Sequence, residues 1–188
     1  MADKKKLRGF SALHFWPVTA NDDTAYTTGT KFSVPAVVSA TMTRNTEDYT
    51  DYADDGIYDS GSEFKDDTFE IVLQELPIEL AAKLDGATYS DTDKVYSWGT
   101  TSAAPELAMG FRCLMRSGNY LMIQYYSVTC TAIKVDYQTK GASNEGSQYT
   151  LTVKAATRKG DNLVVRKKES TQASDLSWLD AVDQLPAT

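Results

Sequence analysis

The sequence predicts a mainly β protein: a β-sandwich or partly open barrel with one short flanking α-helix, a long acidic loop and a C-terminal arm. Three observations lead to this fold class. The 188 residues include 11 tyrosines and many threonines, which favour strands over helices. Several stretches alternate apolar and polar side chains with a period of two, as half-buried strands do. One internal stretch, 77–85, carries both a start and a stop signal for a helix.

The length favours one domain with extensions, since domains cluster near 100–150 residues. We expect a basic N-terminal segment over 1–8, a β-sandwich domain over 9–160 and a C-terminal extension over 161–188. No apolar run follows the basic segment, so it is not expected to be a signal peptide. No stretch approaches the ~20 apolar residues of a membrane helix. We therefore expect a soluble protein made in the cytoplasm, with no membrane partner.

The first strands are predicted over 9–19, near 26–34 and over 36–44. The single histidine, His14, shares a face with Phe10 and Trp16 in the first of them. A packed structural histidine is therefore favoured over a catalytic one.

Residues 45–63 break the alternating pattern and are dense in acid and tyrosine, so we predict a long acidic loop. Loops of more than about 12–15 residues are usually functional or disordered. Exposed tyrosines favour contact with a partner, because they supply rigid amphipathic area at interfaces. A calcium loop is disfavoured, because Ala53 stands where the spacing from Asp51 requires an oxygen ligand. The candidate subunit-interaction residues are Tyr49, Asp51, Tyr52, Asp54, Asp55, Ile57 and Tyr58.

A strand is predicted over 67–76, with Phe69, Ile71 and Leu73 facing inward. The helix follows over 77–85: Pro77 suits the first helical position, and Gly86 suits the left-handed residue past the end. Glu79 and Lys83 form an i,i+4 pair on its exposed side. The residues expected to pack the helix on the sheet are Ile78, Leu80, Ala81 and Leu84.

Residues 105–136, at the centre of the fold, predict two antiparallel strands joined at Ser117-Gly118-Asn119, since glycine and asparagine tolerate the positive φ of a tight turn. The first strand alternates and is expected to be half-buried. Its core-facing residues are Leu107, Met109, Phe111, Cys113 and Met115.

The second strand is apolar on both faces, so a second layer or another subunit is expected to cover each side. It is too long to stay straight, and we predict a bend or a change of sheet near Ser127-Val128-Thr129. Its predicted faces are Tyr120, Met122, Tyr126, Val128 and Ala132 on one side, and Leu121, Ile123, Tyr125, Ile133 and Val135 on the other.

The chain ends with a strand and an arm. Tyr149, Leu151, Val153 and Ala155 alternate with polar residues and face the core. Ser174 is a plausible N-cap for a short amphipathic helix in the extension. This arm either docks on a neighbouring subunit or on its own barrel, or it is a mobile tail. Its expected contact residues are Leu176, Trp178, Leu179 and Val182.

The sequence contains few residues in patterns typical of catalysis or metal binding, so we predict that the protein is not an enzyme and binds no cofactor or metal. It contains no glycine-rich phosphate loop, no His/Cys metal spacing and no nucleophile motif, and one histidine gives little general-base capacity. Cys113 and Cys130 lie in predicted core strands and are expected to be reduced thiols. The formal net charge of −7 argues against a nucleic-acid-binding surface, because such binding draws its affinity from neutralised phosphates.

Over roughly 30–160 the chain resembles the major tail tube proteins of phages with long, non-contractile tails (siphovirus type). The resemblance lies in Tyr52-Ala53-Asp54-Asp55-Gly56-Ile57-Tyr58 followed by the strand and helix start at 69–77. It continues with Ala108-Met109-Gly110-Phe111-Arg112 and the final strand 149–155.

The resemblance implies a structural virion protein of β-sandwich fold. Six subunits would close a ring, and rings would stack into a tail tube through which DNA passes during ejection without specific binding. Its implied partners are other copies of itself and other tail proteins: tape measure, terminator and distal tail protein. The implied location is the virion tail, assembled in the host cytoplasm.

Two alternatives stay open. One is a tail-terminator or head–tail joining protein of related fold. The other is a monomeric β-sandwich module that binds carbohydrate or another surface ligand, with Tyr49, Tyr52 and Tyr58 stacking on sugar rings.

Overall fold

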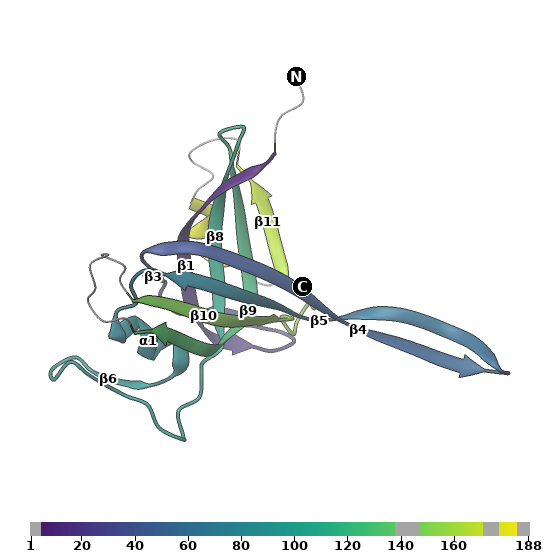
Figure 1. Ribbon diagram of the computed structural model, residues 1–188, viewed down its shortest axis with the longest axis horizontal. Coiled ribbons are helices and arrows are strands. Elements are labelled where there is room, and N and C mark those ends of the chain that lie inside the picture. Colours follow the sequence, from purple (N-terminus) through teal and green to yellow (C-terminus); the bar gives the residue numbers. More distant parts are fainter. Residues whose placement is uncertain (1–4, 138–146, 171–176, 184–188) are drawn as a thin grey trace.

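The computed structural model describes residues 5–137, 147–170 and 177–183, and the predicted fold class is confirmed (Figure 1). The described chain is mainly β, with a single short α-helix. The strands are β1 (Leu7–Asn21), β2 (Tyr26–Thr28), β3 (Phe32–Val34), β4 (Val37–Ala53), β5 (Gly56–Leu73), β6 (Thr88–Ser90), β7 (Val95–Ser97), β8 (Leu107–Met115), β9 (Tyr120–Asp136), β10 (Gln148–Ala156) and β11 (Val165–Glu169); the helix is α1 (Ile78–Asp85).

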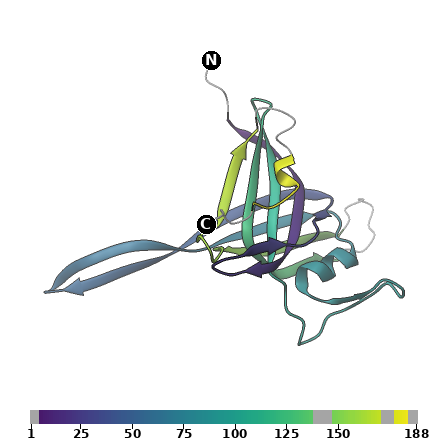
Figure 2. The ribbon, with the colours of Figure 1, turned by 180° about the vertical axis from the view of Figure 1, so that it is seen from behind.

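One antiparallel sheet folds over on itself. Its strand order is β2-β1-β8-β9-β10-β5-β4, with β3 paired to β1 and β11 paired to β9, while β6 and β7 form a separate small pair. The half with β1, β8 and β11 crosses the half with β4, β5 and β10 (Figures 1 and 2). The apolar core fills the space between the two halves. It includes the predicted inward residues of β5, β8 and β10, among them Phe69, Ile71, Leu73, Leu107, Met109, Phe111, Leu151, Val153 and Ala155.

β9 belongs to both halves. Its first part pairs with β8 and β11, and from Ser127 onward it pairs with β10, so the predicted change of sheet near Ser127-Val128-Thr129 is confirmed. The pairing of β9 with β8 shifts register between Tyr125 and Val128, and its pairing with β10 shifts register between Cys130 and Ala132. Each extra residue turns the following side chains to the other face. The predicted face is therefore wrong for Val128, which lies in the main core with Tyr125 and not beside Tyr126. Beyond the second shift Ile133 packs against the main core on the side of Tyr125, as predicted.

The helix forms where expected, but one of its packing residues differs. Gly86 ends it with φ 75°, and Lys83 donates to Glu79 at 2.5 Å. Pro77 occupies the N-cap position, one residue earlier than predicted. Leu84 is buried, and Leu80 and Ala81 pack against the core. Ile78 is 48% exposed, and Ala82 is buried in its place. The helix is thus rotated slightly about its axis, so that the face it buries differs from the face that the apolar pattern predicted.

His14 and the two cysteines have structural surroundings. The His14 Nδ1 lies 2.8 Å from the Ser33 hydroxyl, and its ring meets Trp16 edge-on. Burial lowers the pKa of His14. Cys113 and Cys130 are both free thiols, and burial raises the pKa of Cys130 to about 12. No helix in the described part of the chain is long and apolar enough to cross a bilayer.

Candidate subunit-interaction surfaces

The segment expected as a long acidic loop is a β-hairpin that projects from the body. β4 and β5 stay paired from Asn45 with Asp66 out to Ala53 with Gly56, and we call residues 45–66 the ribbon. It extends beyond the rest of the molecule (Figure 1) by roughly 30 Å, at about 3.3 Å per residue. The expectation of a loop is thus corrected. A ribbon exposed on both sides needs no apolar face, so it lacks the one-sided alternation by which strands are recognised.

The turn at the ribbon tip carries the signal that could have revealed the hairpin. Asp54 and Asp55 adopt φ values of 49° and 63°, and Gly56 opens the return strand. Two consecutive left-handed residues are typical of the two-residue hairpin turn, and aspartate tolerates that conformation better than most residues. Asp54 and Asp55 therefore shape the turn.

One side of the ribbon, which we call the acidic face, carries Glu47, Asp51, Asp59 and Glu63. Glu47 lies directly opposite Glu63, and Asp51 lies opposite Asp59. Like charges facing each other across a strand pair are destabilising. Between these pairs the Tyr49 ring lies over Gly61, where an added Cβ would fall 2.6 Å from the Tyr49 hydroxyl. Tyr49 is thus partly used within the ribbon itself.

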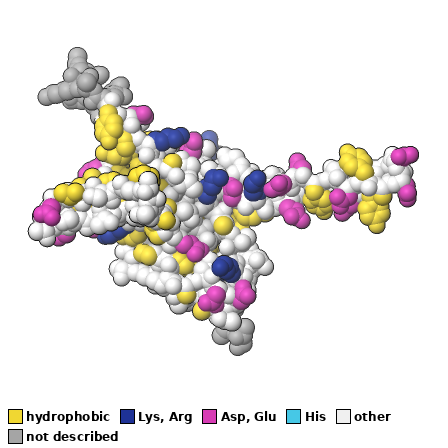
Figure 3. All heavy atoms as spheres, turned by 90° about the horizontal axis from the view of Figure 1, so that it is seen from below, with side chains coloured by type: hydrophobic (Ala, Val, Ile, Leu, Met, Phe, Trp, Pro, Cys, Tyr) yellow, Lys and Arg dark blue, Asp and Glu magenta, His cyan; other side chains and the backbone are white. Residues whose placement is uncertain are grey.

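The opposite side, which we call the apolar face, carries Tyr52, Ile57 and Phe64. Tyr52 and Ile57 are cross-strand neighbours near the tip, 75% and 66% exposed. Tyr58 is 79% exposed and sits where the register shifts. Figure 3 shows acidic and hydrophobic side chains alternating along the projection. Of the seven predicted interaction residues, six therefore divide among the turn, the acidic face and the apolar face, and Tyr58 lies at the register shift; all seven lie on the ribbon, outside the core.

The ribbon also accounts for the whole net charge. It contains eight acids and one base, a formal charge of −7, and the complete chain has the same net charge of −7. The remaining residues are therefore neutral in sum, with 18 bases and 18 acids. The acidity that the composition assigned to the protein as a whole is local to this projection.

A polar clamp fixes the ribbon where it leaves the body. Arg44 donates two hydrogen bonds to Asp67, at 2.8 and 2.9 Å, and Asp67 is fully buried. The Tyr125 hydroxyl donates to the same carboxylate at 3.3 Å. Burial, with the adjacent Asp67, raises the pKa of Tyr125. A two-point Arg–carboxylate pair constrains direction as well as distance, so the clamp sets the angle at which the ribbon emerges.

The C-terminal arm, residues 177–183, lies on the outer face of β8 and β9. Gln124 of β9 donates from Nε2 to the carbonyls of Trp178 and Ala181, both at 2.8 Å. Leu179 and Val182 are buried, Trp178 is half-buried, and Leu176 lies outside the described residues. At Gly110 an added Cβ would lie 2.9 Å from the Trp16 ring and 3.3 Å from Leu179. Of the alternatives for the arm, the structure selects docking on its own sheet.

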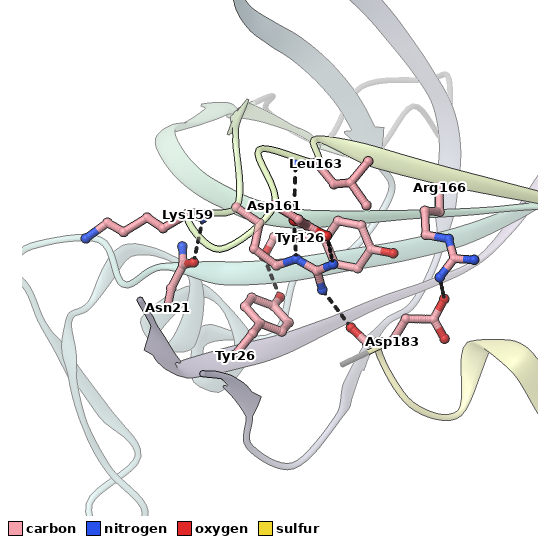
Figure 4. Close-up of polar contacts among 9 residues, drawn as sticks. Asn21, Tyr26, Tyr126, Lys159, Asp161, Leu163, Arg166 and Asp183 are labelled. Carbon is pink, nitrogen blue, oxygen red and sulfur yellow. Dashed lines mark hydrogen bonds and ion pairs between the residues drawn. The ribbon is translucent and has the colours of Figure 1, made fainter. Parts of the chain in front are cut away.

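Arg158 ties the end of the arm to the sheet. Figure 4 shows Tyr126, Asp161 and Asp183, which surround this contact. The Arg158 guanidinium is 1% exposed, donates to both carboxylate oxygens of Asp161 at 2.9 and 2.5 Å, and donates to the Asp183 carbonyl at 2.9 Å. The cation also lies 4.0 Å from the Tyr126 ring centre. The Arg158 hydrogen bond holds the pKa of Asp161 below its usual range. Arg166 adds an ion pair to the Asp183 carboxylate at 2.7 Å.

The arm explains why β9 is buried on both faces. One face of β9 contributes to the main core, and the other contributes Tyr126 to a second cluster with Trp16, Tyr26, Ala108 and Val182. No second subunit is needed to cover it. Two-sided burial of β9 therefore gives no evidence of assembly. Gln124 and Arg158 escaped the sequence analysis, although a glutamine inside an apolar strand was a usable signal.

An apolar pocket of about 820 Å³ lies between α1, residues 96–104 and the second half of β9. Ile78, Trp98 and Ile133 are among its lining residues, and the Tyr96 hydroxyl donates to Asp85. Burial and Asp85 raise the pKa of Tyr96 to about 12. The pocket lies apart from Tyr49, Tyr52 and Tyr58, which were the residues considered for stacking on sugars. Those tyrosines stand on a narrow ribbon and line neither this pocket nor the smaller one beside α1.

No protein-family profile matches the sequence, and no curated protein matches it. Among solved structures, the fold is similar to that of the anti-feeding prophage cap (AFP tube terminating cap), determined by cryo-EM. The two share 12% sequence identity with a TM-score of 0.41, over 83% of this chain and 88% of the cap chain.

Proposed function

We propose that this chain is a self-assembling structural protein of a phage tail. Six copies would close into a ring, and rings would stack into a tube that conducts DNA during ejection. The observation that carries the proposal is the ribbon, a long hairpin clamped at its base that exposes Tyr52, Ile57 and Tyr58 to solvent. The likeness of the sequence to tail tube proteins adds support over 30–160.

The ribbon favours assembly on physical grounds. A two-stranded hairpin alone is marginally stable in water, and this one carries facing acids and uncovered aromatic side chains. A partner surface would bury its apolar face and stabilise it. β4 is also the last strand of the sheet, and no described strand pairs with its outer edge. Natural proteins rarely leave a long edge uncovered, and closure into a ring is one way to cover it.

The proposed role for DNA is passage without specific binding. Taken as a whole the chain has a net charge of −7, and this overall excess of negative charge opposes the binding of phosphates. Tape measure, terminator and distal tail proteins would be its neighbours in the virion tail.

Removing the ribbon tests the proposal. In the test variant, an Asn-Gly turn replaces residues 47–63, joining the cross-strand neighbours Thr46 and Phe64. Residues 47–63 contribute no side chain to the core, so the variant should fold with a Tm close to that of the full chain. Sedimentation and negative-stain microscopy should show rings or tubes for the full chain and only monomers for the variant.

Other outcomes have distinct meanings. Normal tubes from the shortened variant would exclude the ribbon as an assembly element. Single rings that never stack would favour the terminator alternative. A full chain that stays monomeric at every concentration would overturn the proposal.

A further inference from the structure

A second charged surface lies at the end of the body where β1 begins, β8 turns into β9, and β11 finishes (Figures 1 and 2). Several contacts bring these segments together. Leu7 pairs with Met115, the Arg116 amide donates to the Lys6 carbonyl, and Lys5 forms an ion pair with Glu169 at 2.9 Å. We call this surface the basic end. Its members are Lys5, Lys6, Arg8, Arg112, Arg116, Arg166, Lys167 and Lys168.

The basic end is exposed and strongly positive. All its side chains are exposed except that of Arg112, which is half-buried over the Tyr120 ring. Among described residues, Glu169 pairs with Lys5 and Asp183 pairs with Arg166. These two acids counted against the eight bases give a formal charge of +6, which is close in size to the −7 of the ribbon.

The ribbon and the basic end of one chain do not meet. The clamp between Arg44 and Asp67 directs the ribbon away from the body, and the basic end lies elsewhere on it (Figure 1). In the described part of the chain no ion pair joins the two surfaces. Complementary surfaces that cannot meet within one molecule can meet between two.

We propose that the acidic face of the ribbon docks on the basic end of a second copy of this chain. This inference rests on the proposed function and names the partner surface for it. The facing pairs Glu47–Glu63 and Asp51–Asp59 place like charges opposite each other, and Lys65, 3.5 Å from Glu47, offsets only the first pair in part. A partner's lysines and arginines would convert both repulsions into attraction. Because each copy offers one surface of each sign, the contact is head-to-tail and generates closed rings or open filaments.

A charge-swap experiment on the full chain tests this pairing. Variant one, D51K/D59K, reverses the sign of one facing pair, keeps that pair like-charged, and brings the acidic face from −4 to 0. Variant two, R116E/K167E, reverses two charges of the basic end and lowers its formal charge from +6 to +2. Each variant alone should need at least a tenfold higher protein concentration to assemble, as measured by sedimentation. The chain that carries all four substitutions, and the mixture of the two variants, should regain it.

Matched controls have the same change of net charge at exposed positions outside both surfaces. D23K/D136K matches the first variant, and K134E/K154E matches the second. Both should assemble like the original chain. Assembly of the original chain should also weaken steeply between about 0.05 and 0.5 M salt, because a contact between exposed charges is screened.

The results separate this inference from the proposed function. If the original chain assembles and the reversals change nothing, or the fourfold variant is not rescued, the charge pairing is wrong and tube formation stands. If the original chain never assembles, the proposed function fails. If R116E/K167E assembles normally and instead loses retention of a DNA duplex, the basic end is a nucleic-acid surface, and the docking proposal is overturned.

Discussion

The ribbon and the C-terminal arm are both extensions of the same β body, but the arm buries its apolar side chains and the ribbon exposes them. The arm is seven described residues long and buries Leu179 and Val182 on β8 and β9. The ribbon is three times longer and exposes Tyr52, Ile57 and Tyr58. The buried side chains of Gln124 and Arg158 donate hydrogen bonds to the carbonyls of the arm. Beyond its clamp the ribbon packs on no other element in the described part of its own chain.

The difference shows which surface is available for a partner. An apolar segment that already lies against its own sheet gains little from a second molecule, whereas an uncovered one gains the burial of its whole contact area. Substitutions in the arm should therefore reduce the stability of the subunit. Substitutions in the outer ribbon should leave the subunit stable and affect only its association.

The largest effect on the free energy of unfolding is expected from Arg158→Ala. This change removes a buried cation and leaves the Asp161 carboxylate and the Asp183 carbonyl without it. Breaking a buried ion pair costs about 3–5 kcal/mol, and we expect the lower end, about 3 kcal/mol, because Asp161 keeps some exposure. Urea unfolding measures the loss. Lys159→Ala, at the adjacent exposed base, should change stability by less than about 0.5 kcal/mol. A loss below 1 kcal/mol for Arg158→Ala would show that the contacts of Arg158 with Asp161 and Asp183 contribute little to stability.

A smaller effect is expected from acidification. The pKa of Asp161 is lowered from its usual 3.8 by the Arg158 hydrogen bond, so the folded chain binds its proton less readily than the unfolded chain. The resulting stability is fully present above pH 3.8 and is lost as the pH falls through the lower folded value. In a W98F background, fluorescence of Trp16 and Trp178 should shift to the red over this range as the arm loosens. D161N should lack the Asp161 part of this transition, and an unchanged transition would show that another group controls it.

The smallest effect on subunit stability is expected from the double variant Y52S/I57S. Both side chains are mostly exposed, so unfolding should change by about 0.5 kcal/mol or less. Ring or tube formation should nevertheless be lost, as judged by negative-stain microscopy. Val95→Ser, at a similarly exposed apolar residue outside the ribbon, is the control and should assemble normally. Intact assembly by Y52S/I57S would show that the apolar face is dispensable and would leave charge as the attraction to test.

Much of the body could be predicted because its strands have one buried and one exposed face. The alternation of Phe69, Ile71 and Leu73 in β5, and of Leu151, Val153 and Ala155 in β10, reports that asymmetry directly, and all six are buried. The helix end at Gly86 was equally readable, since a left-handed C-cap favours glycine. The ribbon was misread because both of its faces are solvated, so neither imposes an apolar period.

The sequence by itself determined the β class, the core strands, the helix and the place where β9 changes neighbours, because each follows from local periodicity and turn chemistry. Only the tertiary structure decided three further points. The arm, and not a second subunit, covers β9; the shifts of register beyond Tyr125 move Val128 to the core; and the acidic segment 45–66 forms a paired hairpin that projects from the body. These points depend on which distant segments come together, and the spacing of residues along a chain carries no direct record of that.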